Sequence, residues 1–220
     1  MLKPSLASLA CMHMVLAWAA PADPLSEMDY FSEQPVVLSP SRLSQPINRA
    51  PAAVTIITRE MIEASGFRQL PDLLRLVPGF QVSWVRGNIQ AVTYQGLSSI
   101  YSRRLQVMVD GRSVYNPAYG QVQWRGIPLA LDDIDRIEVV RGSNAANDGV
   151  NAVQASIHIF TRPASADPGW TVGAAIGSAD ICDGLLRYAG ANGDWQWRAT
   201  LNSRSDDWLK NQRDGARDHL

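Results

Sequence analysis

Cysteine and histidine are scarce in this sequence, which has 2 cysteines and 3 histidines in 220 residues. Cys11 lies in an apolar N-terminal segment that we expect to be removed, which leaves Cys182 as the sole thiol. An intrachain disulfide and a cysteine-based zinc site are then excluded. The motifs Gly-Lys-Ser/Thr, Gly-x-Ser-x-Gly and His-Glu-x-x-His are absent as well. We expect no catalytic site, no metal site and no cofactor, and hence a protein that is not an enzyme.

An excess of charge of one sign is also missing, since 20 lysines and arginines face 21 aspartates and glutamates and the formal net charge is −1. The arginines are scattered singly except for the pair Arg103–Arg104. A nucleic-acid-binding domain normally carries a basic face or stripe, so we expect no nucleic-acid partner. Hydrophobic residues make up 46% of the chain, which argues against wholesale disorder.

One acidic cluster, formed by Asp132, Asp133, Asp135 and Glu138, has to be weighed as a paired-carboxylate site. Asp135 and Glu138 are three residues apart in a strand-like segment, so their side chains would point to opposite faces. Asp132 and Asp133 follow the turn-like sequence 128–130, where a solvated loop is the ordinary explanation. We therefore interpret the cluster as a loop and a strand face rather than as an acid–base pair.

Residues 1–22 have the pattern of a secretory signal peptide. Lys3 is the only charge, an apolar stretch runs from residue 6 to residue 20, and two small-x-small triplets end at Ala19 and Ala22. A membrane anchor is the alternative, but a spanning helix needs about 20 apolar residues and this stretch is shorter. We expect a secreted chain that is cleaved after Ala19 or Ala22.

Residues 23–50 are rich in proline and serine, with Pro24, Pro35, Pro40 and Pro46 spread along them. Proline lacks a backbone N–H and disfavours helix, so we expect an extended, mobile arm. Within it, one short apolar run has residue types that suit a strand: Pro35, Val36, Val37, Leu38 and Ser39. A linker with a few aliphatic side chains is the alternative explanation of this run.

Residues 51–162 contain strand-like and helix-like patterns in turn. Thr58 is a predicted N-cap and Gly66 a predicted helix end, and a second helix near residue 70 would stop at Pro78–Gly79. The dipeptide Asp110–Gly111 predicts a type I′ hairpin. The predicted strands are 54–57, 80–85, 105–109, 112–115, 134–140 and 156–161. Two short helices among these strands indicate a compact α+β domain with a mixed sheet.

Residues 163–220 change in character. Three segments of alternating polarity, 170–176, 185–189 and 195–202, are separated by turn-rich sequences. On the last of them, one face would carry Trp195, Trp197, Ala199 and Leu201. Such segments are typical of a transmembrane antiparallel β-barrel, and a soluble β-meander is the alternative.

Five motifs stand in one order along the chain: Val54–Ile62, Leu70–Phe80, Val107–Arg112, Asp135–Gly142 and Ile157–Arg162. This ordered set resembles the plug domain of TonB-dependent outer-membrane receptors, over residues 30–162 and more loosely to residue 205. The resemblance implies a plug folded inside a barrel of about 22 strands, in the outer membrane of a Gram-negative bacterium. It also implies energy-coupled uptake of a scarce nutrient, most often a ferric siderophore and otherwise cobalamin, haem, another metal chelate or a sugar.

The resemblance further implies three sets of functional residues. The run 35–39 would be the TonB box, which binds the inner-membrane protein TonB by strand addition. Two plug loops, 85–90 and 115–124, would contact a small-molecule ligand such as a metal chelate, through Trp84, Arg86, Asn88, Tyr115, Asn116, Tyr119 and Trp124. Three strand residues would dock the plug inside a polar barrel: Arg136, Glu138 and Arg141. The alternatives are aromatic rings that pack against the barrel wall and a solvated strand face.

Some positions depart from the usual pattern of these receptors. Gln95–Gly96 stands where Arg-Gly is usual, Asp148 stands where an aromatic residue is usual, and Ala155–Ile159 replaces Gly-Val-Ile-Asn-Ile. These departures put tight docking of the last plug strand in question.

The stretch after Arg162 is short for a barrel. Its 58 residues suffice for about three or four spanning strands with their turns, whereas the smallest single-chain barrels use about eight. We therefore expect that these 220 residues transport nothing by themselves. A stand-alone periplasmic plug-like ligand-binding module, or a non-functional truncated receptor, is the alternative to the N-terminal part of a receptor.

Overall fold

The computed structural model describes residues 35–86, 89–97, 101–178, 180–193 and 195–206, together with the backbone of 218–219. The expected signal peptide, residues 23–34 of the expected arm and Asn88 lie outside the described residues. Within the described ranges, no helix is long and apolar enough to cross a membrane.

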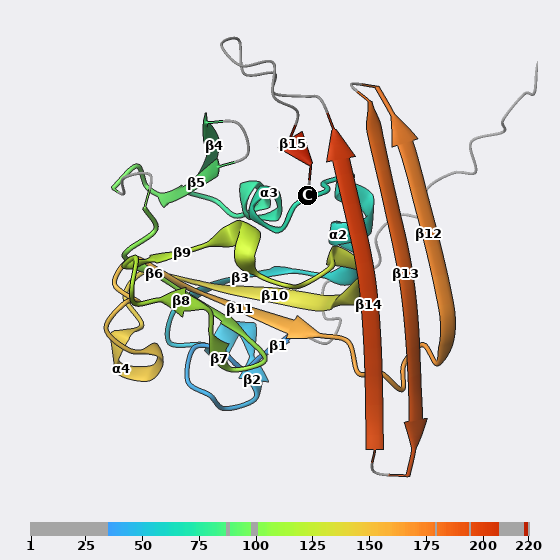
Figure 1. Ribbon diagram of the computed structural model, residues 1–220. Coiled ribbons are helices and arrows are strands. Elements are labelled where there is room, and N and C mark those ends of the chain that lie inside the picture. Colours follow the sequence, from blue (N-terminus) through green and yellow to red (C-terminus); the bar gives the residue numbers. More distant parts are fainter. Residues whose placement is uncertain are drawn as a thin grey trace, which may run out of the picture. The chain divides into compact units, whose positions relative to one another are not determined.

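The centre of the plug domain is a five-stranded sheet with the strand order β3-β10-β11-β6-β7 (Figure 1). Its strands are β3 (Ala53–Ile57), β6 (Leu105–Val109), β7 (Arg112–Ser113), β10 (Ile134–Arg141) and β11 (Ala155–Thr161). Strand β10 is antiparallel to both of its neighbours, β3 and β11, whereas β11 is parallel to β6. The sheet is therefore mixed, as the sequence predicts.

Short helices complete the core of the plug domain. Helix α2 (Arg59–Ser65) and helix α3 (Leu70–Leu73), which continues into the 3-10 turn η3 (Leu74–Leu76), follow β3 along the chain. Their apolar side chains join the buried cluster of the sheet, which includes Ile57, Ile62, Leu73, Leu74, Ile137 and Ile157. Burying this many large aliphatic side chains is the main force that holds the domain together.

The predicted helix cap, helix end and hairpin turn are present in the structure. The Thr58 side chain accepts a hydrogen bond from the Met61 amide at 3.4 Å, and Gly66 ends α2 in the left-handed region at φ +66°. Asp110 and Gly111 both have positive φ, as a type I′ turn requires. In the part of the chain that the structure describes, the α-helix α4 (Ala145–Asp148), between β10 and β11, was not predicted.

Two further hairpins belong to the plug domain. Strand β4 (Phe80–Arg86) pairs with β5 (Ile89–Tyr94), and β8 (Tyr115–Asn116) pairs with β9 (Gln121–Val122). Two 3-10 turns follow along the chain, η4 (Trp124–Gly126) and η5 (Leu131–Asp133). The loops predicted to contact a ligand belong to these two hairpins.

Three long strands, here called the wall strands, follow the plug domain: β12 (Gly169–Gly177), β13 (Ile181–Asn192) and β14 (Trp195–Asp206). They run side by side as an antiparallel meander, with the short β15 (Asp218–His219) against β14 (Figure 1). The strand register places Trp170, Tyr188 and Ala199 in one row and Val172, Leu186 and Leu201 in the next. This face is apolar and exposed, and the wall strands resemble the start of a barrel, as predicted.

Residues 35–50 differ from the extended, mobile arm that their prolines suggest. Strand β1 (Val36–Val37) pairs with β2 (Gln45–Pro46), and the 3-10 turn η2 (Ile47–Arg49) leads into β3. Val37 is fully buried, and its burial supplies order that the local composition does not predict.

Candidate functional site

The expected TonB box is held on the plug domain by a buried carboxylate. Glu138, in the centre of β10, is fully buried, and its Oε2 accepts hydrogen bonds from the Leu38 amide, the Ser39 amide and the Ser39 hydroxyl, at 2.9, 2.9 and 2.7 Å. Its Oε1 accepts a hydrogen bond from Arg136 Nε at 2.9 Å. Burial raises the pKa of the Glu138 carboxyl, but these hydrogen bonds outweigh it and hold the pKa below its usual value.

Helix α4 holds the next residues of the same segment. Asn147 Nδ2 donates to the Pro40 carbonyl at 2.6 Å, and Asn144 Nδ2 lies 3.5 Å from the Ser39 carbonyl. Arg42 in turn donates to the Asn147 carbonyl. Residues 38–40 are thus held through their backbone by side chains of the plug domain, and Arg42 is held through its own side chain.

Two of the departures from the usual receptor pattern pair with each other. Asp148 Oδ2 lies 2.8 Å from His158 Nε2, and Asn144 Nδ2 donates to the same oxygen at 2.7 Å. Burial raises the pKa of the Asp148 carboxyl. The contacts with His158, Ser156 and Asn144 lower this pKa by a larger amount, so the net shift is downward. Strand β11, which carries His158, pairs over its full length with β10, so the altered sequence keeps its place in the sheet.

The two expected ligand loops meet at a cavity of about 260 Å³. It is lined by Ile89, Gln90, Gln121, Val122, Gln123, Trp124, Arg125 and Gly126. Gln90 is 5% exposed, and its Oε1 is buried with no hydrogen-bond partner among the described residues. A buried acceptor without a partner is costly, so this oxygen is suited to a donor supplied by water or by a ligand.

The expected ligand residues occupy different environments. Tyr119 is exposed, whereas Trp84, Tyr115 and Asn116 are half-buried. The backbone of Arg86 ends β4.

Trp124 lines the cavity but belongs to the buried core, and its Nε1 lies 3.4 Å from Ser102 Oγ. Arg125 and Gln123 were not among the expected residues. The alternation Gln121-Val122-Gln123, with the apolar residue pointing inward, is the sequence signal that could have indicated Gln123.

Of the predicted docking residues, Arg136 contacts residues of the plug domain, and Glu138 contacts Arg136 and residues 38–39. Arg136 pairs with Asp135 at 3.2 Å and with Glu138, and its guanidinium lies 4.2 Å from the centre of the Phe160 ring. The buried Nε of Arg141 has no hydrogen-bond partner among the residues that the structure describes. Docking by these residues against a barrel wall therefore stays a prediction.

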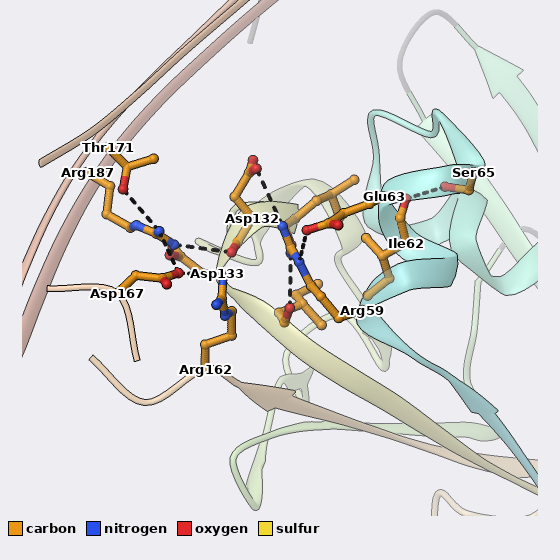
Figure 2. Close-up of polar contacts among 12 residues, drawn as sticks. Arg59, Ile62, Glu63, Ser65, Asp132, Asp133, Arg162, Asp167, Thr171 and Arg187 are labelled. Carbon is orange, nitrogen blue, oxygen red and sulfur yellow. Dashed lines mark hydrogen bonds and ion pairs between the residues drawn. The ribbon is translucent and has the colours of Figure 1, made fainter. Parts of the chain in front are cut away.

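The contacts between the plug domain and the wall strands use other residues. Arg187 of β13 is 5% exposed, and its guanidinium lies 3.3 Å from Asp133, 3.3 Å from Asp167 and 3.2 Å from Thr171 Oγ1. Figure 2 shows Arg187 pointing toward these three residues. Arg198 of β14 lies 3.4 Å from the same Asp133 carboxylate. Two wall arginines therefore converge on one buried carboxylate of the plug domain.

A second contact links the end of α2 to the wall strands. Arg68 donates from Nε and Nη2 to the Asp183 carboxylate, at 2.6 and 2.5 Å, and from Nη1 to Asp206 at 2.8 Å. Arg204 donates to the Arg68 carbonyl. The hydrogen bond to Asp183 is the main reason why the pKa of Arg68 is raised. Bidentate pairs of this kind fix orientation as well as distance.

An α+β domain that is bound by ion pairs to strands with an exposed apolar face has the architecture of an outer-membrane receptor with its plug. The family description "TonB-dependent Receptor Plug Domain" matches residues 46–156. The chain belongs to the TonB-dependent outer-membrane receptors.

Relatives and solved structures match this chain over part of their own length. The vitamin B12 transporter BtuB of Vibrio cholerae serotype O1 is 34% identical over 199 residues, which cover 88% of this chain and 32% of the transporter. The iron-regulated outer membrane virulence protein of the same species is 30% identical over 136 residues, with 60% and 20% covered. The ferripyoverdine receptor of Pseudomonas aeruginosa aligns with a TM-score of 0.61 at 21% identity, over 78% of this chain and 22% of the receptor. The chain thus spans about a third of the length of the curated relatives it matches first.

Proposed function

We propose that this chain forms the plug and the first wall strands of a receptor that imports a scarce nutrient across the outer membrane with energy from TonB. The observation that carries the proposal is the cavity between the two hairpins, where Gln90 offers a buried carbonyl oxygen without a partner among the described residues. The curated relatives include vitamin B12 transporters, which supports uptake rather than catalysis.

For the cargo we propose a metal chelate. The eight cavity-lining residues include three carboxamides and one guanidinium, and no carboxylate is among them. Carboxamides both donate and accept hydrogen bonds, which suits a ligand rich in amide groups such as cobalamin. The vitamin B12 transporters among the relatives favour cobalamin, whereas a ferric siderophore is what the resemblance implies most often and is bound by the ferripyoverdine receptor.

A chimaeric receptor can decide between these cargoes. Residues 35–206 replace the matching part of the Vibrio cholerae vitamin B12 transporter, and outer membranes are titrated with radiolabelled cyanocobalamin and with ferric siderophores. We expect saturable binding of cyanocobalamin that weakens about tenfold or more in Gln90→Ala, because one buried hydrogen bond to the ligand is lost. Gln81→Ala, at an exposed glutamine of β4 outside the cavity, is the matched control. Binding of a siderophore but not of cyanocobalamin would reassign the cargo.

For the coupling partner we propose that residues 35–39 pair with TonB by strand addition. The backbone supplies the affinity in this mode, so residue 37 has to keep its N–H. A peptide of residues 33–41 should compete with the full chain for the periplasmic domain of TonB, and the same peptide with Val37→Pro should not. A Val37→Thr peptide, which keeps the backbone and the side-chain shape, is the control. Equal competition by the proline peptide excludes this segment.

A further inference from the structure

The two polar atoms of the Gln90 side chain have different surroundings. Nε2 donates to Asp72 Oδ2 at 3.3 Å, whereas Oε1 is buried with no hydrogen-bond partner among the described residues. Gln90 lines the 260 Å³ cavity and also a cavity of about 30 Å³ that shares Gln90, Trp124 and Arg125 with it. The amide thus turns its NH2 group to α3 and leaves its oxygen to the cavities.

The carboxylate of Asp72 determines this orientation of the amide. A carboxylate oxygen only accepts hydrogen bonds, so Gln90 has to present its NH2 group to it. The carboxylate is itself held, because Asp72 Oδ1 accepts from Arg75 Nε at 3.3 Å and the Asp72 side chain is 15% exposed. If the amide turned over, its oxygen would face a second acceptor. Gln90 Oε1 is therefore kept on the side away from Asp72.

The other polar side chains of the larger cavity differ from Gln90 in what they offer. Gln121 and Gln123 carry amides that each provide a donor and an acceptor, and Arg125 is an exposed cation that only donates. Gln90 Oε1 is thus a buried acceptor whose direction is fixed by a charged neighbour. Such a group can distinguish a ligand donor from a ligand acceptor.

We propose that Asp72 is a positioning residue that sets the specificity of the cavity through Gln90. The fixed amide selects cargo that places an N–H or O–H group at Gln90, such as a carboxamide or a hydroxyl group. It rejects cargo that places a carboxylate, ketone or ester oxygen there. This inference deepens the proposed function and rests on it, since it names the chemical group that the same cavity takes.

The burial of Gln90 gives the selection its strength. A ligand donor satisfies Oε1, whereas a ligand acceptor in the same place sets two acceptors against each other and displaces any water that serves Oε1. Sites built to hydrogen-bond an N–H or O–H group reject an analogue that lacks it. An asparagine at position 72 removes the selection, because its amide can donate or accept and Gln90 can then turn over.

Two small probes of the same shape test the selection without any assumption about the cargo. N-methylacetamide has an N–H group where methyl acetate has an ester oxygen. The full chain in detergent, with its glutamine side chains labelled with 15N, is titrated with each probe, and the Gln90 signal is assigned by its absence in Gln90→Ala. We expect N-methylacetamide to bind about tenfold or more tightly than methyl acetate, because one buried hydrogen bond separates the two.

Two variants separate positioning from structure. Asp72→Asn keeps the shape of the side chain and should reduce the ratio of the two affinities to about threefold or less, mainly through tighter binding of methyl acetate. A purely structural loss would weaken both probes and leave the ratio unchanged. Arg75→Gln is the matched control, because it removes the contact with Asp72 Oδ1 and leaves the carboxylate that faces Gln90. Its ratio should stay at the wild-type value.

Three results overturn the proposal. Equal binding of the two probes by the wild-type chain shows that the cavity does not select a donor. A Gln90 signal that neither probe shifts shows that water alone serves Oε1. An unchanged ratio in Asp72→Asn shows that Asp72 does not set it. If the chimaeric receptor binds neither cyanocobalamin nor a ferric siderophore while the probes still differ, the proposed cargo is wrong and the role of Asp72 stands.

Discussion

The carboxylates of Asp133 and Glu138 have different tasks because their surroundings differ. Asp133 closes the turn η5 and receives Arg187 and Arg198 from the wall strands, whereas Glu138, within β10, receives the N-terminal segment. Both are almost fully buried, so each has to keep its partners to offset the loss of water. At the scale of single residues, the plug domain is thus connected to the wall strands at Asp133 and to the N-terminal segment at Glu138.

The wall contact predicts a large effect at Asp133. Asp133→Asn removes the charge that two arginines share, and Arg187 is too buried to be rescued by solvent. We expect a loss of about 3 kcal/mol in the free energy of unfolding, at the low end for breaking a buried pair because Arg187 keeps Asp167. The urea midpoint of the full chain in detergent measures it. Asp132→Asn is the control, since this half-exposed neighbour lies 3.8 Å from Arg59, and equal losses in the two variants contradict the assignment.

Acid should loosen the N-terminal segment. The pKa of Glu138 in the folded chain lies below its usual value of 4.5, so the carboxylate contributes stability that is complete above pH 4.5 and is lost as the pH falls through the folded-state pKa. The pKa of Asp148 is lowered as well, which adds a loss of the same sign below its usual value of 3.8. A spin label can be attached at Leu43→Cys, in the exposed turn between β1 and β2, with Cys182→Ser removing the other thiol. The mobility of this label should therefore rise below about pH 4.5 in a chain that keeps Glu138. A Glu138→Gln chain should lack the Glu138 part of this rise, and identical profiles refute the link.

At the scale of elements, much of the plug domain is predictable because its signals are local. The Thr58 cap, the Gly66 end and the Asp110–Gly111 turn each depend on a few neighbouring residues, and the structure confirms all three. The order of residues 35–50 was missed because proline density is also a local signal, whereas this order comes from Glu138, about 100 residues away.

The candidate site was less predictable for the same reason. Arg187 looks like one polar residue of an alternating strand, and only the position of β13 beside Asp133 gives it a role. The pairing of Asp148 with His158 also depends on how α4 and β11 meet. A pattern within one segment does not contain such contacts. Residues that begin or end an element could therefore be predicted from the sequence, whereas residues that connect two elements could not.

The turn before β4 predicts a difference between two glycines. Gly79 and Gly66 both have positive φ, but a Cβ at Gly79 would lie 2.8 Å from the Tyr94 ring, whereas a Cβ at Gly66 meets nothing within 4 Å. Both alanine variants carry the left-handed backbone cost of about 1 kcal/mol. We expect Gly79→Ala to lose about 1–2 kcal/mol more than Gly66→Ala, because Tyr94 packs on Phe80 and has to move. Thermal unfolding of the two variants compares them, and equal melting temperatures disprove the close approach.

At the scale of the whole molecule, the described chain has two kinds of surface that belong in different solvents. The plug domain buries its apolar side chains in one cluster. The wall strands instead expose a row of large apolar side chains, with Trp170 69%, Val172 76% and Ile176 88% exposed. A soluble protein rarely exposes so continuous an apolar surface, whereas lipid would cover it.

The exposed apolar face of the wall strands predicts that a charged side chain is tolerated on the opposite face but not on this one. In the chimaeric receptor, Val172→Lys should reduce the amount of protein assembled in the outer membrane, since a lysine facing lipid costs about 2–4 kcal/mol near the bilayer midplane. Asn202→Lys, on the opposite face of β14 and at a similar height, should assemble normally. Heat-modifiable receptor in washed outer membranes is the measurement. Equal assembly of the two variants would place the apolar face away from lipid.

The position of β3 at the edge of its sheet determines where a mechanical load enters the plug domain. A pull on residue 35 passes along β1, β2 and η2 to Ala53, the first residue of β3. In the described sheet, β3 is hydrogen-bonded to β10 alone, and Ala53 pairs with Arg141 at one end of that ladder. Peeling therefore breaks these bonds one after another and leaves the β10-β11-β6 centre intact. We therefore expect the plug domain to yield first at its N-terminal edge, where β3 has one hydrogen-bonded neighbour, and later in the strands that have two.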